Sequence, residues 1–234
     1  MNIALIKAGG VGTRMGMGVP KQFITINGKP IIIYTLEQFE LHPSIDEIVV
    51  ICVDGWHDVL RAYAQKYNIT KLRIIVSGGT TSLRSIKNGV TAISEKYSDE
   101  DIILVHDGNR PVITQEIISD VIVKANIYGS AVAAIPCTDE IMEINENKTG
   151  SRKFMDHKKT YRIQTPDAYR LSILKKIFER ATEEQLDTIG ATNTLMIDLG
   201  EEVHFAQGSE LNIRLTTQED ILQCEALLVM EKRM

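Results

Sequence analysis

The order of apolar and amphipathic runs along this chain limits the folds it can adopt. Short apolar runs with little polar alternation are typical of strands covered on both faces, and we predict strands at Asn2–Ile6, Glu47–Val53, Leu72–Val76, Asp101–Val105 and Ala131–Ile135. Longer amphipathic runs separate them, and we predict helices at Pro30–Glu40, His57–Tyr67, Ser82–Tyr97, Gln115–Ala125, Ala168–Ala181 and Gln218–Lys232. This alternation predicts an α/β fold with a mostly parallel sheet.

One region departs from this alternation. Between Cys137 and Thr165 the sequence becomes polar, and its centre, Asn145–Gly150, is rich in turn-forming residues. Two extended stretches, Asp139–Ile144 and Lys159–Gln164, flank that centre. We interpret residues 137–164 as a projecting β-arm, and a flexible surface loop is the alternative. Because no linker or repeat divides the sequence, we expect one domain over residues 1–234 that carries this arm.

A glycine-rich loop follows the first predicted strand. Residues 7–16 read KAGGVGTRMG, and residues 20–22 read PKQ. Glycines let backbone N–H groups approach an anion closely, and Arg14 and Lys21 add positive charge beside them. A dinucleotide fingerprint would need a further glycine where Met15 stands, and a P-loop would need Ser or Thr where Pro30 follows Lys29. The loop therefore indicates a triphosphate site of another kind.

Two other segments follow predicted strands, where parallel sheets bind ligands. Residues 78–85 (GGTTSLRS) combine paired glycines with hydroxyls that suit a base edge, and a helix N-cap at Thr81 or Ser82 is the alternative or companion role. Residues 106–111 read HDGNRP. Asp107 beside a triphosphate suits a magnesium ion, Mg²⁺, which takes one or two carboxylates plus phosphate oxygens. We expect His106 to be a packing residue, because transfer to a phosphate oxygen needs little proton transfer.

Charge and composition exclude several classes of function. The net charge of −5 disfavours general nucleic-acid binding. The three cysteines are far apart and form no C-x-x-C pair, so neither a disulfide framework nor a zinc site is indicated. No apolar run is long enough for a membrane span, and the first residues do not resemble a signal peptide. We expect a cytoplasmic protein.

Taken together, these motifs resemble the cytidylyltransferase family that includes 2-C-methyl-D-erythritol 4-phosphate and ribitol-5-phosphate cytidylyltransferases. The resemblance rests on residues 8–16 (AGGVGTRMG), 20–23 (PKQF), 106–111 (HDGNRP) and 162–166 (RIQTP), in family order and spacing. It covers residues 2 to about 225. It implies a Rossmann-like domain, a homodimer joined through exchanged β-arms, and Mg²⁺-dependent transfer of a cytidylyl group from CTP to a small phosphorylated acceptor, with no nucleic acid or membrane as partner.

The family's functional positions are carried over one by one. Matches to the triphosphate contacts are Gly10, Gly12, Thr13, Arg14 and Lys21. Matches to the cytidine contacts are Ala8, Gly9, Gly79, Ser85 and Gly108, and Arg110 lies in the same nucleotide-binding motif. The metal carboxylate matches Asp107. The resemblance implies catalysis by Arg14, Lys21 and Arg214, and acceptor binding by Glu140, His157 and Thr165.

Differences from the methylerythritol-phosphate enzymes lie mainly on the acceptor side. His157 stands where those enzymes have an arm Arg, and Glu140 where they have an arm Thr. Their Asp-Asn-Ile-Lys motif reads Leu211-Asn212-Ile213-Arg214, and their Thr-Asp-Glu segment reads Gly190-Ala191-Thr192. On the nucleotide side, Thr80 replaces a frequent Asp. The nucleotide half therefore follows the family, and the acceptor half diverges from this branch of it.

Three readings of the function follow. Gly9-Gly10, Thr13 and Leu211 favour a ribitol 5-phosphate-like acceptor. Methylerythritol phosphate is the alternative within the enzyme class. A non-catalytic nucleotide-binding paralogue is the alternative from another class, motivated by the replaced acceptor residues. Arg14, Lys21 and Asp107 speak against it, because a protein that only binds need not keep all three.

Overall fold

A mostly parallel sheet forms the centre of the computed structural model, which describes residues 1–10 and 18–231. Within this described part, the sheet has seven strands in the order β11-β7-β10-β6-β1-β4-β5. Strand β10 runs antiparallel to both of its neighbours, and the other described pairs are parallel. The strands are β1 (Asn2–Ala8), β4 (Glu47–Cys52), β5 (Leu72–Ser77), β6 (Ile102–Asp107), β7 (Ser130–Pro136), β10 (Tyr161–Arg170) and β11 (Phe205–Gln207).

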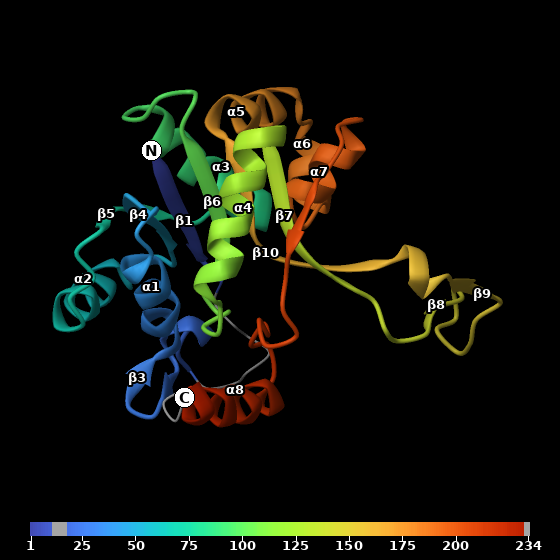
Figure 1. Cartoon of the computed structure of the whole chain (residues 1–234), viewed down its shortest axis with the longest axis horizontal. Helices are drawn as coiled ribbons and strands as arrows, with labels where there is room; N and C mark the ends of the chain where they lie inside the picture. The colour runs from blue at the N-terminus through green and yellow to red at the C-terminus, as the bar shows by residue number, and fades with distance from the viewer. Residues whose placement is uncertain (11–17, 232–234) are drawn as a thin grey trace.

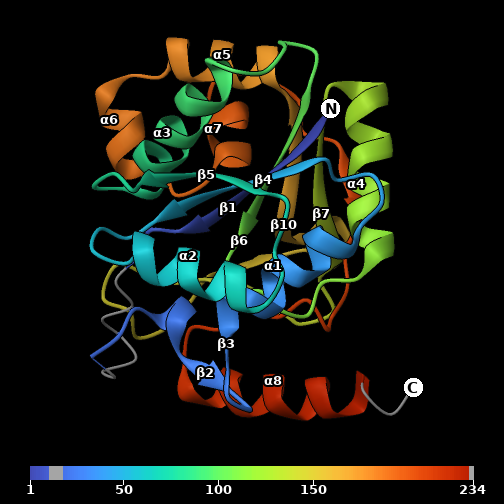
Figure 2. The same cartoon turned by 90° about the vertical axis from the view of Figure 1, so that its left-hand side faces the viewer.

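Helices cover both faces of this sheet (Figure 2). Each face of the sheet has its own hydrophobic core, and strand β1 contributes to both because its side chains alternate between the faces. Ala4 and Ile6 pack with α1, α2 and α4, whereas Ile3 and Leu5 pack with α3, α5, α6 and α7. The helices are α1 (Ile31–Leu41), α2 (His57–Lys66), α3 (Ser82–Ser94), α4 (Gln115–Tyr128), α5 (Leu171–Arg180), α6 (Glu183–Thr188) and α7 (Thr192–Asp198). The predicted fold class is confirmed.

The C-terminal helix α8 (Gln218–Glu231) belongs to a smaller third cluster. It packs its buried Cys224 and Leu228 near the short hairpin of β2 (Thr25–Ile26) and β3 (Lys29–Pro30). The hydroxyl of Thr217 accepts a hydrogen bond from the Asp220 backbone N–H and so caps the start of this helix. The hairpin follows the short 3₁₀ helix η2 (Lys21–Phe23).

The predicted helix Ala168–Ala181 begins too early. Residues Ala168–Arg170 complete strand β10, where they pair with Ile102–Leu104 of β6. Ala168 and Tyr169 are fully buried there. Their apolar character therefore comes from their place inside the sheet, and the helix α5 starts only at Leu171.

The predicted arm is present, but one of its two strands was misplaced. The hairpin pairs β8 (Ile141–Glu143) with β9 (Lys153–Met155). The predicted partner, Lys159–Gln164, instead enters the central sheet through β10, where Arg162 and Ile163 pair with β7. We define the arm by residues 138–159, which also hold the 3₁₀ helix η3 (His157–Lys159). Figure 1 shows it extending away from the body.

No helix in the described residues is long and apolar enough to span a membrane.

Several short elements were not predicted, among them α6, α7 and β11. They are too short for hydrophobic periodicity to be read from sequence. Their role is architectural: α6 and α7 cover one sheet face, and β11 extends the sheet edge beside β7.

Candidate active site

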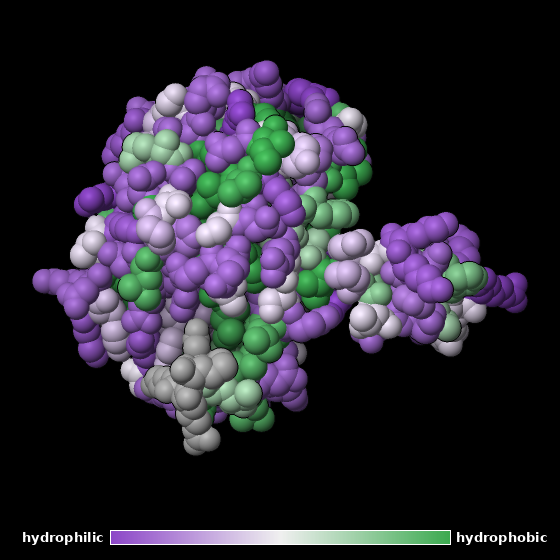
Figure 3. Space-filling model, viewed as in Figure 1, coloured by the Kyte–Doolittle hydropathy of each residue, from purple (hydrophilic) through white to green (hydrophobic). Residues whose placement is uncertain are grey.

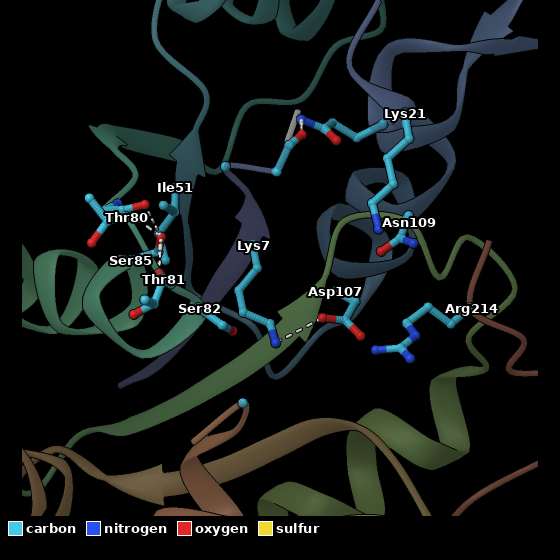
Figure 4. A pocket seen from close by; sticks show the side chains of 15 residues that line it. Lys7, Lys21, Ile51, Thr80, Thr81, Ser82, Ser85, Asp107, Asn109 and Arg214 are labelled. Atoms are coloured by element: carbon cyan, nitrogen blue, oxygen red, sulfur yellow. Dashed lines mark hydrogen bonds and ion pairs between the residues drawn. The ribbon is translucent and has the colours of Figure 1, made fainter. Parts of the chain in front are cut away.

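A cavity of about 550 Å³ opens at the carboxyl ends of β1, β4 and β6. It is the place where an open parallel sheet is expected to bind a ligand. Three chain segments predicted from the sequence meet there: the start of the glycine loop, the loop before α3, and the end of β6. Figure 4 shows their side chains around one space. The remaining lining includes Gln22, Ile51, Gly190 and Arg214.

The described start of the glycine loop is held in place by Gln22. Its Nε2 donates to the carbonyl oxygens of Ala8 at 2.6 Å and Gly10 at 3.1 Å. Gly9 and Gly10 line the cavity, and Ala8 is buried just behind them. Lys21, the residue before Gln22, reaches into the cavity toward Asn109 (Figure 4). The predicted residues Gly12, Thr13 and Arg14 lie outside the described residues.

The loop before α3 forms the opposite wall. The Gly79 backbone N–H donates to the Ser85 hydroxyl at 2.9 Å, and that hydroxyl donates to the Thr81 carbonyl at 2.8 Å. A Cβ on Gly79 would lie 2.7 Å from Cβ of Arg84, so only glycine fits. Thr81 is the helix N-cap, as one of the two sequence alternatives proposed. Gly79 and Ser85, the two cytidine contacts predicted in this loop, line the cavity together with residues 80–82.

Asp107 stands between two cations at the end of β6. Its Oδ1 lies 2.8 Å from Nζ of Lys7, and its Oδ2 lies 3.2 Å from Nε of Arg110. Burial acts to raise the pKa of this carboxyl, but Lys7 and Arg110 outweigh burial and hold the pKa well below its usual range. Asp107 is therefore an ionised carboxylate on the cavity wall.

His106 is fully buried and does not line the cavity. Its Nε2 lies 3.2 Å from the Arg110 carbonyl, which can only accept, so Nε2 carries the proton. Its Nδ1 lies 3.0 Å from the Thr165 hydroxyl. Burial lowers the pKa of His106 to about 3, so the ring is neutral. The expectation that it is a packing residue agrees with this geometry.

Thr165 is placed differently from expectation. Its hydroxyl donates to His106 and accepts the Asp107 backbone N–H at 3.1 Å. The side chain is buried beneath the end of β6 and does not line the cavity. In this structure Thr165 therefore supports the backbone of Asp107, and its assignment to the acceptor stays a prediction.

Arg110 and Gly108 also lie behind the cavity wall. The Arg110 guanidinium is buried and donates to the Asn212 carbonyl at 2.6 Å as well as to Asp107. A Cβ on Gly108 would lie 2.9 Å from the Lys7 carbonyl, so its glycine permits close approach of backbone to backbone. Of residues 106–111, only Asp107 and Asn109 line the cavity. Gly108 and Arg110, which were predicted as nucleotide contacts, instead hold the backbone and the carboxylate behind the cavity wall.

Asn109 and Asn212 carry Arg214 to the cavity. Asn109 exchanges backbone and side-chain hydrogen bonds with Leu215, and the buried Asn212 donates to the Thr165 carbonyl at 2.8 Å. These bonds fix the segment that holds Arg214, whose guanidinium points toward Asp107 (Figure 4). The predicted cations Lys21 and Arg214 therefore share one cavity.

Glu140 and His157 lie on the arm, outside the lining of this cavity. The His157 Nδ1 lies 3.4 Å from Oε1 of Glu140. The arm stands clear of the body in the space-filling view (Figure 3). Within one chain, the structure does not bring these two predicted acceptor residues to Lys21 and Arg214.

Lys7 is the main residue that sequence reasoning missed. It lines the cavity with Asp107 and Ile51, the residues that pair with it in β6 and β4. The available signal was a lysine that directly follows the apolar run Ile3–Ile6. Asn109 and Gly190 were not predicted as site residues either, although Asn109 lies within residues 106–111 and Gly190 in the segment that replaces Thr-Asp-Glu.

Known proteins resemble this chain over almost its full length. The family model for 2-C-methyl-D-erythritol 4-phosphate cytidylyltransferase, IspD, matches residues 2–230. A ribitol-5-phosphate cytidylyltransferase of Lacticaseibacillus paracasei is 42% identical over 97% of this chain and 98% of its own. A 2-C-methyl-D-erythritol 4-phosphate cytidylyltransferase of Syntrophus aciditrophicus is 34% identical over 98% and 97%. The solved 4-diphosphocytidyl-2C-methyl-D-erythritol synthase of Anaerococcus prevotii shares the fold, with a TM-score of 0.80 at 24% identity over 98% and 96% of the two chains.

Proposed function

Because this chain belongs to the IspD family of cytidylyltransferases, we propose that it transfers CMP from CTP to ribitol 5-phosphate or a closely similar polyol phosphate. The observation that supports this acceptor is the gradient of similarity. The ribitol-5-phosphate enzyme of L. paracasei is 42% identical over nearly the full length of both chains, against 34% for the methylerythritol-phosphate enzyme of S. aciditrophicus. The residues Gly9-Gly10, Thr13 and Leu211 point the same way.

The reaction is a direct displacement at phosphorus. An oxygen of the acceptor phosphate attacks the α-phosphorus of CTP, a new P–O bond forms, and the bond to the β-phosphate breaks to release pyrophosphate. The nucleophile is already anionic, so the reaction needs no general base. His106 is buried away from the cavity with both ring nitrogens hydrogen-bonded, so we assign it no part in proton transfer. Catalysis consists of alignment and charge stabilisation.

The cavity supplies positive charge on the side where phosphates would lie. Lys21 and Arg214 both line it, and we assign them to the triphosphate and to the reacting phosphates. Arg14 is assigned to the triphosphate from the family motif alone. The loop of residues 79–85 offers backbone groups and hydroxyls to the cytosine edge, and Ile51 presents an apolar side chain beside them.

Mg²⁺ is proposed as the cofactor, with Asp107 as its protein ligand. The described residues hold no cluster of three or more potential metal ligands, which suits an ion that takes a single carboxylate together with phosphate oxygens and water. Asp107 is ionised and lines the cavity. When bound there, Mg²⁺ would neutralise charge on the phosphates.

The arm supports a proposal of homodimerisation. Its hairpin exposes apolar side chains, and Phe154 is 75% exposed. The neighbouring surface of the body is also apolar. There the rings of Tyr161 and Phe205 stack with their centroids 5.0 Å apart, and both side chains are partly exposed. We propose that two copies exchange arms across this surface, and that His157 and Glu140 complete the acceptor pocket of the partner.

A pyrophosphate-release assay tests the function. CTP and Mg²⁺ are supplied with ribitol 5-phosphate, with methylerythritol phosphate, and with a panel of other sugar and alcohol phosphates. Preferential release with ribitol 5-phosphate is expected. Preference for methylerythritol phosphate would assign the other acceptor, and CTP binding without turnover on the whole panel would identify a non-catalytic paralogue.

A second assay tests the metal assignment. Asp107→Asn keeps the shape of the side chain but removes the charge that a hard cation requires. We expect the Mg²⁺ concentration for half-maximal rate to rise about tenfold or more, since charge-assisted contacts are worth roughly 1.5–3 kcal/mol. An unchanged Mg²⁺ titration would place the metal elsewhere.

A further inference from the structure

Lys7 stands at the end of a row of apolar side chains on strand β1. Along β1, the side chains of Ile3 and Leu5 enter the core on the same face of the sheet as Lys7, and the cavity begins where that apolar row ends. The parallel register sets Asp107 on one side of Lys7 and Ile51 on the other. The lysine therefore stands on the floor of the cavity, at the end of a central strand.

Stability alone does not account for a lysine at this place. The side chains of Lys7 and Asp107 are only 20% and 13% exposed. A partly buried ion pair contributes little net stability compared with apolar residues of similar size. An apolar residue at position 7 would extend the core formed by Ile3 and Leu5.

Asp107 has a second counter-charge besides Lys7. Arg110 already pairs with its other oxygen at 3.2 Å, and the same guanidinium is fixed by the Asn212 carbonyl. Arg110 does not line the cavity, whereas Lys7 does. Of the two cations on this carboxylate, the lysine is the one that a bound phosphate chain can contact.

We propose that Lys7 is a substrate-binding cation built into the reaction centre, which pairs with Asp107 in the free protein and contacts the phosphates of CTP in the complex. The proposal rests on the assignment of CTP as a substrate. Lysine suits this exchange, because its ammonium is a compact charge on a flexible stem that can turn from one oxygen to another. Lys7, Lys21 and Arg214 then surround the phosphates from three sides of the cavity.

This exchange links Lys7 to the proposed Mg²⁺. Both cations use the carboxylate of Asp107, so each weakens the other's hold on it. Without Mg²⁺, Lys7 is expected to supply part of the affinity for CTP. With Mg²⁺ at Asp107, Lys7 is released toward the phosphates. Removing Lys7 should therefore weaken binding of metal-free CTP and lower the Mg²⁺ concentration needed by the enzyme.

The test measures CTP binding by calorimetry in EDTA, and Mg²⁺ dependence by turnover. The variants are Lys7→Met, Lys7→Arg and the control Lys29→Met. Lys29 forms a similar partly buried pair, with Glu37 at 2.7 Å, but does not line the cavity. The Kd of metal-free CTP should rise about tenfold to a hundredfold in Lys7→Met, as for loss of a charged hydrogen bond. It should change by less than about threefold in Lys7→Arg and in the control.

The outcomes separate the proposals. If Lys7→Met binds metal-free CTP as tightly as the unmodified protein, Lys7 does not contact the nucleotide and this inference is overturned. A higher Mg²⁺ requirement in Lys7→Met would also overturn it, because competition for Asp107 predicts a lower one. If Lys7→Met does not fold, Lys7→Gln keeps a hydrogen bond to Asp107 without the charge and takes its place. Weakened CTP binding in a protein without transferase activity would support this contact and reject the proposed reaction.

Discussion

The cavity and the arm are built in opposite ways. Residues of the cavity hold their places through the core: Asp107 ends a buried strand, Gln22 clamps two carbonyl groups, and Asn212 is fully buried. The arm is a hairpin of two short strands whose side chains are almost all exposed. Its ends meet at a hydrogen bond from the Cys137 N–H to the Thr160 carbonyl, 2.9 Å long.

The cavity can form within one chain, whereas the arm needs a surface to pack against. Core packing fixes the cavity within one chain, because each side chain that lines it has buried neighbours. Exposed hairpins of this size have little stability of their own. An arm that carries Glu140, His157 and exposed apolar side chains therefore needs a second surface, which we propose is another copy of the chain.

Replacing the whole arm should have the largest effect on the protein. The close approach of Cys137 and Thr160 allows residues 138–159 to be replaced by a short glycine–serine turn without disturbing β7 or β10. We expect loss of dimerisation and loss of acceptor turnover to background, with CTP affinity changed less than about threefold. Light scattering, pyrophosphate release and calorimetry measure the three. A fully active monomer would disprove the exchanged-arm proposal.

Mixed dimers test whether the arm of one subunit completes the active site of the other. Lys21 and Arg214 line one cavity, so a heterodimer of Lys21→Ala with Arg214→Ala should carry one defect in each site and be nearly inactive. A heterodimer of Lys21→Ala with a disabling His157 variant should collect both defects in one site and retain about half of the activity, as an exchanged arm requires. Equal activity of the two heterodimers would contradict exchange.

A single change at the cavity should have the next largest effect. Lys21→Ala removes a charge beside the triphosphate, and turnover should fall about 10²-fold or more, as for other single electrostatic contacts in active sites. The fold should be retained, because Lys21 lies in a short 3₁₀ helix on the cavity rim. Circular dichroism checks the fold, and wild-type turnover in a folded variant would remove Lys21 from the mechanism.

The pH dependence of folding stability tests the protonation of Asp167, a buried carboxyl of strand β10. Burial raises the pKa of Asp167 to about 7, and its Oδ1 has no hydrogen-bond partner. An unfolded aspartate titrates near 3.9, so between that pH and about 7 the folded protein keeps a proton that the unfolded chain has lost. Stability from this group is therefore lost as the pH rises through that window, with a slope of up to about 1.4 kcal/mol per pH unit.

Asp167→Asn should remove that slope. The amide oxygen can still accept from the Tyr169 hydroxyl and the Asn193 amide, as Oδ2 does now. We expect the variant to be more stable than the wild type at pH 8 by about 1–3 kcal/mol, and to lose this advantage at pH 5. Denaturant unfolding at both values measures it. Parallel pH profiles for the two proteins would show that Asp167 is ionised throughout.

The smallest effect is expected at the tip of the arm. Residues 146–152 form a largely exposed turn whose hydrogen bonds stay within the hairpin, to Asn145 and to Lys153. Shortening this turn while keeping β8 and β9 should change activity by less than about twofold and leave the dimer intact, because loop length has a weak energetic effect. Loss of the dimer would assign the interface to the tip.

Local patterns in the sequence determined the order of strands and helices, the glycine loop and the segments around Asp107. They did so because periodicity and turn chemistry are properties of neighbouring residues. The tertiary structure decided which of these residues face the ligand. It turned Thr165 and Arg110 inward, drew Tyr161–Gln164 into the sheet, and set Lys7 beside Asp107. Such outcomes depend on register between distant strands and on burial, because a one-residue shift would send a side chain to the other face.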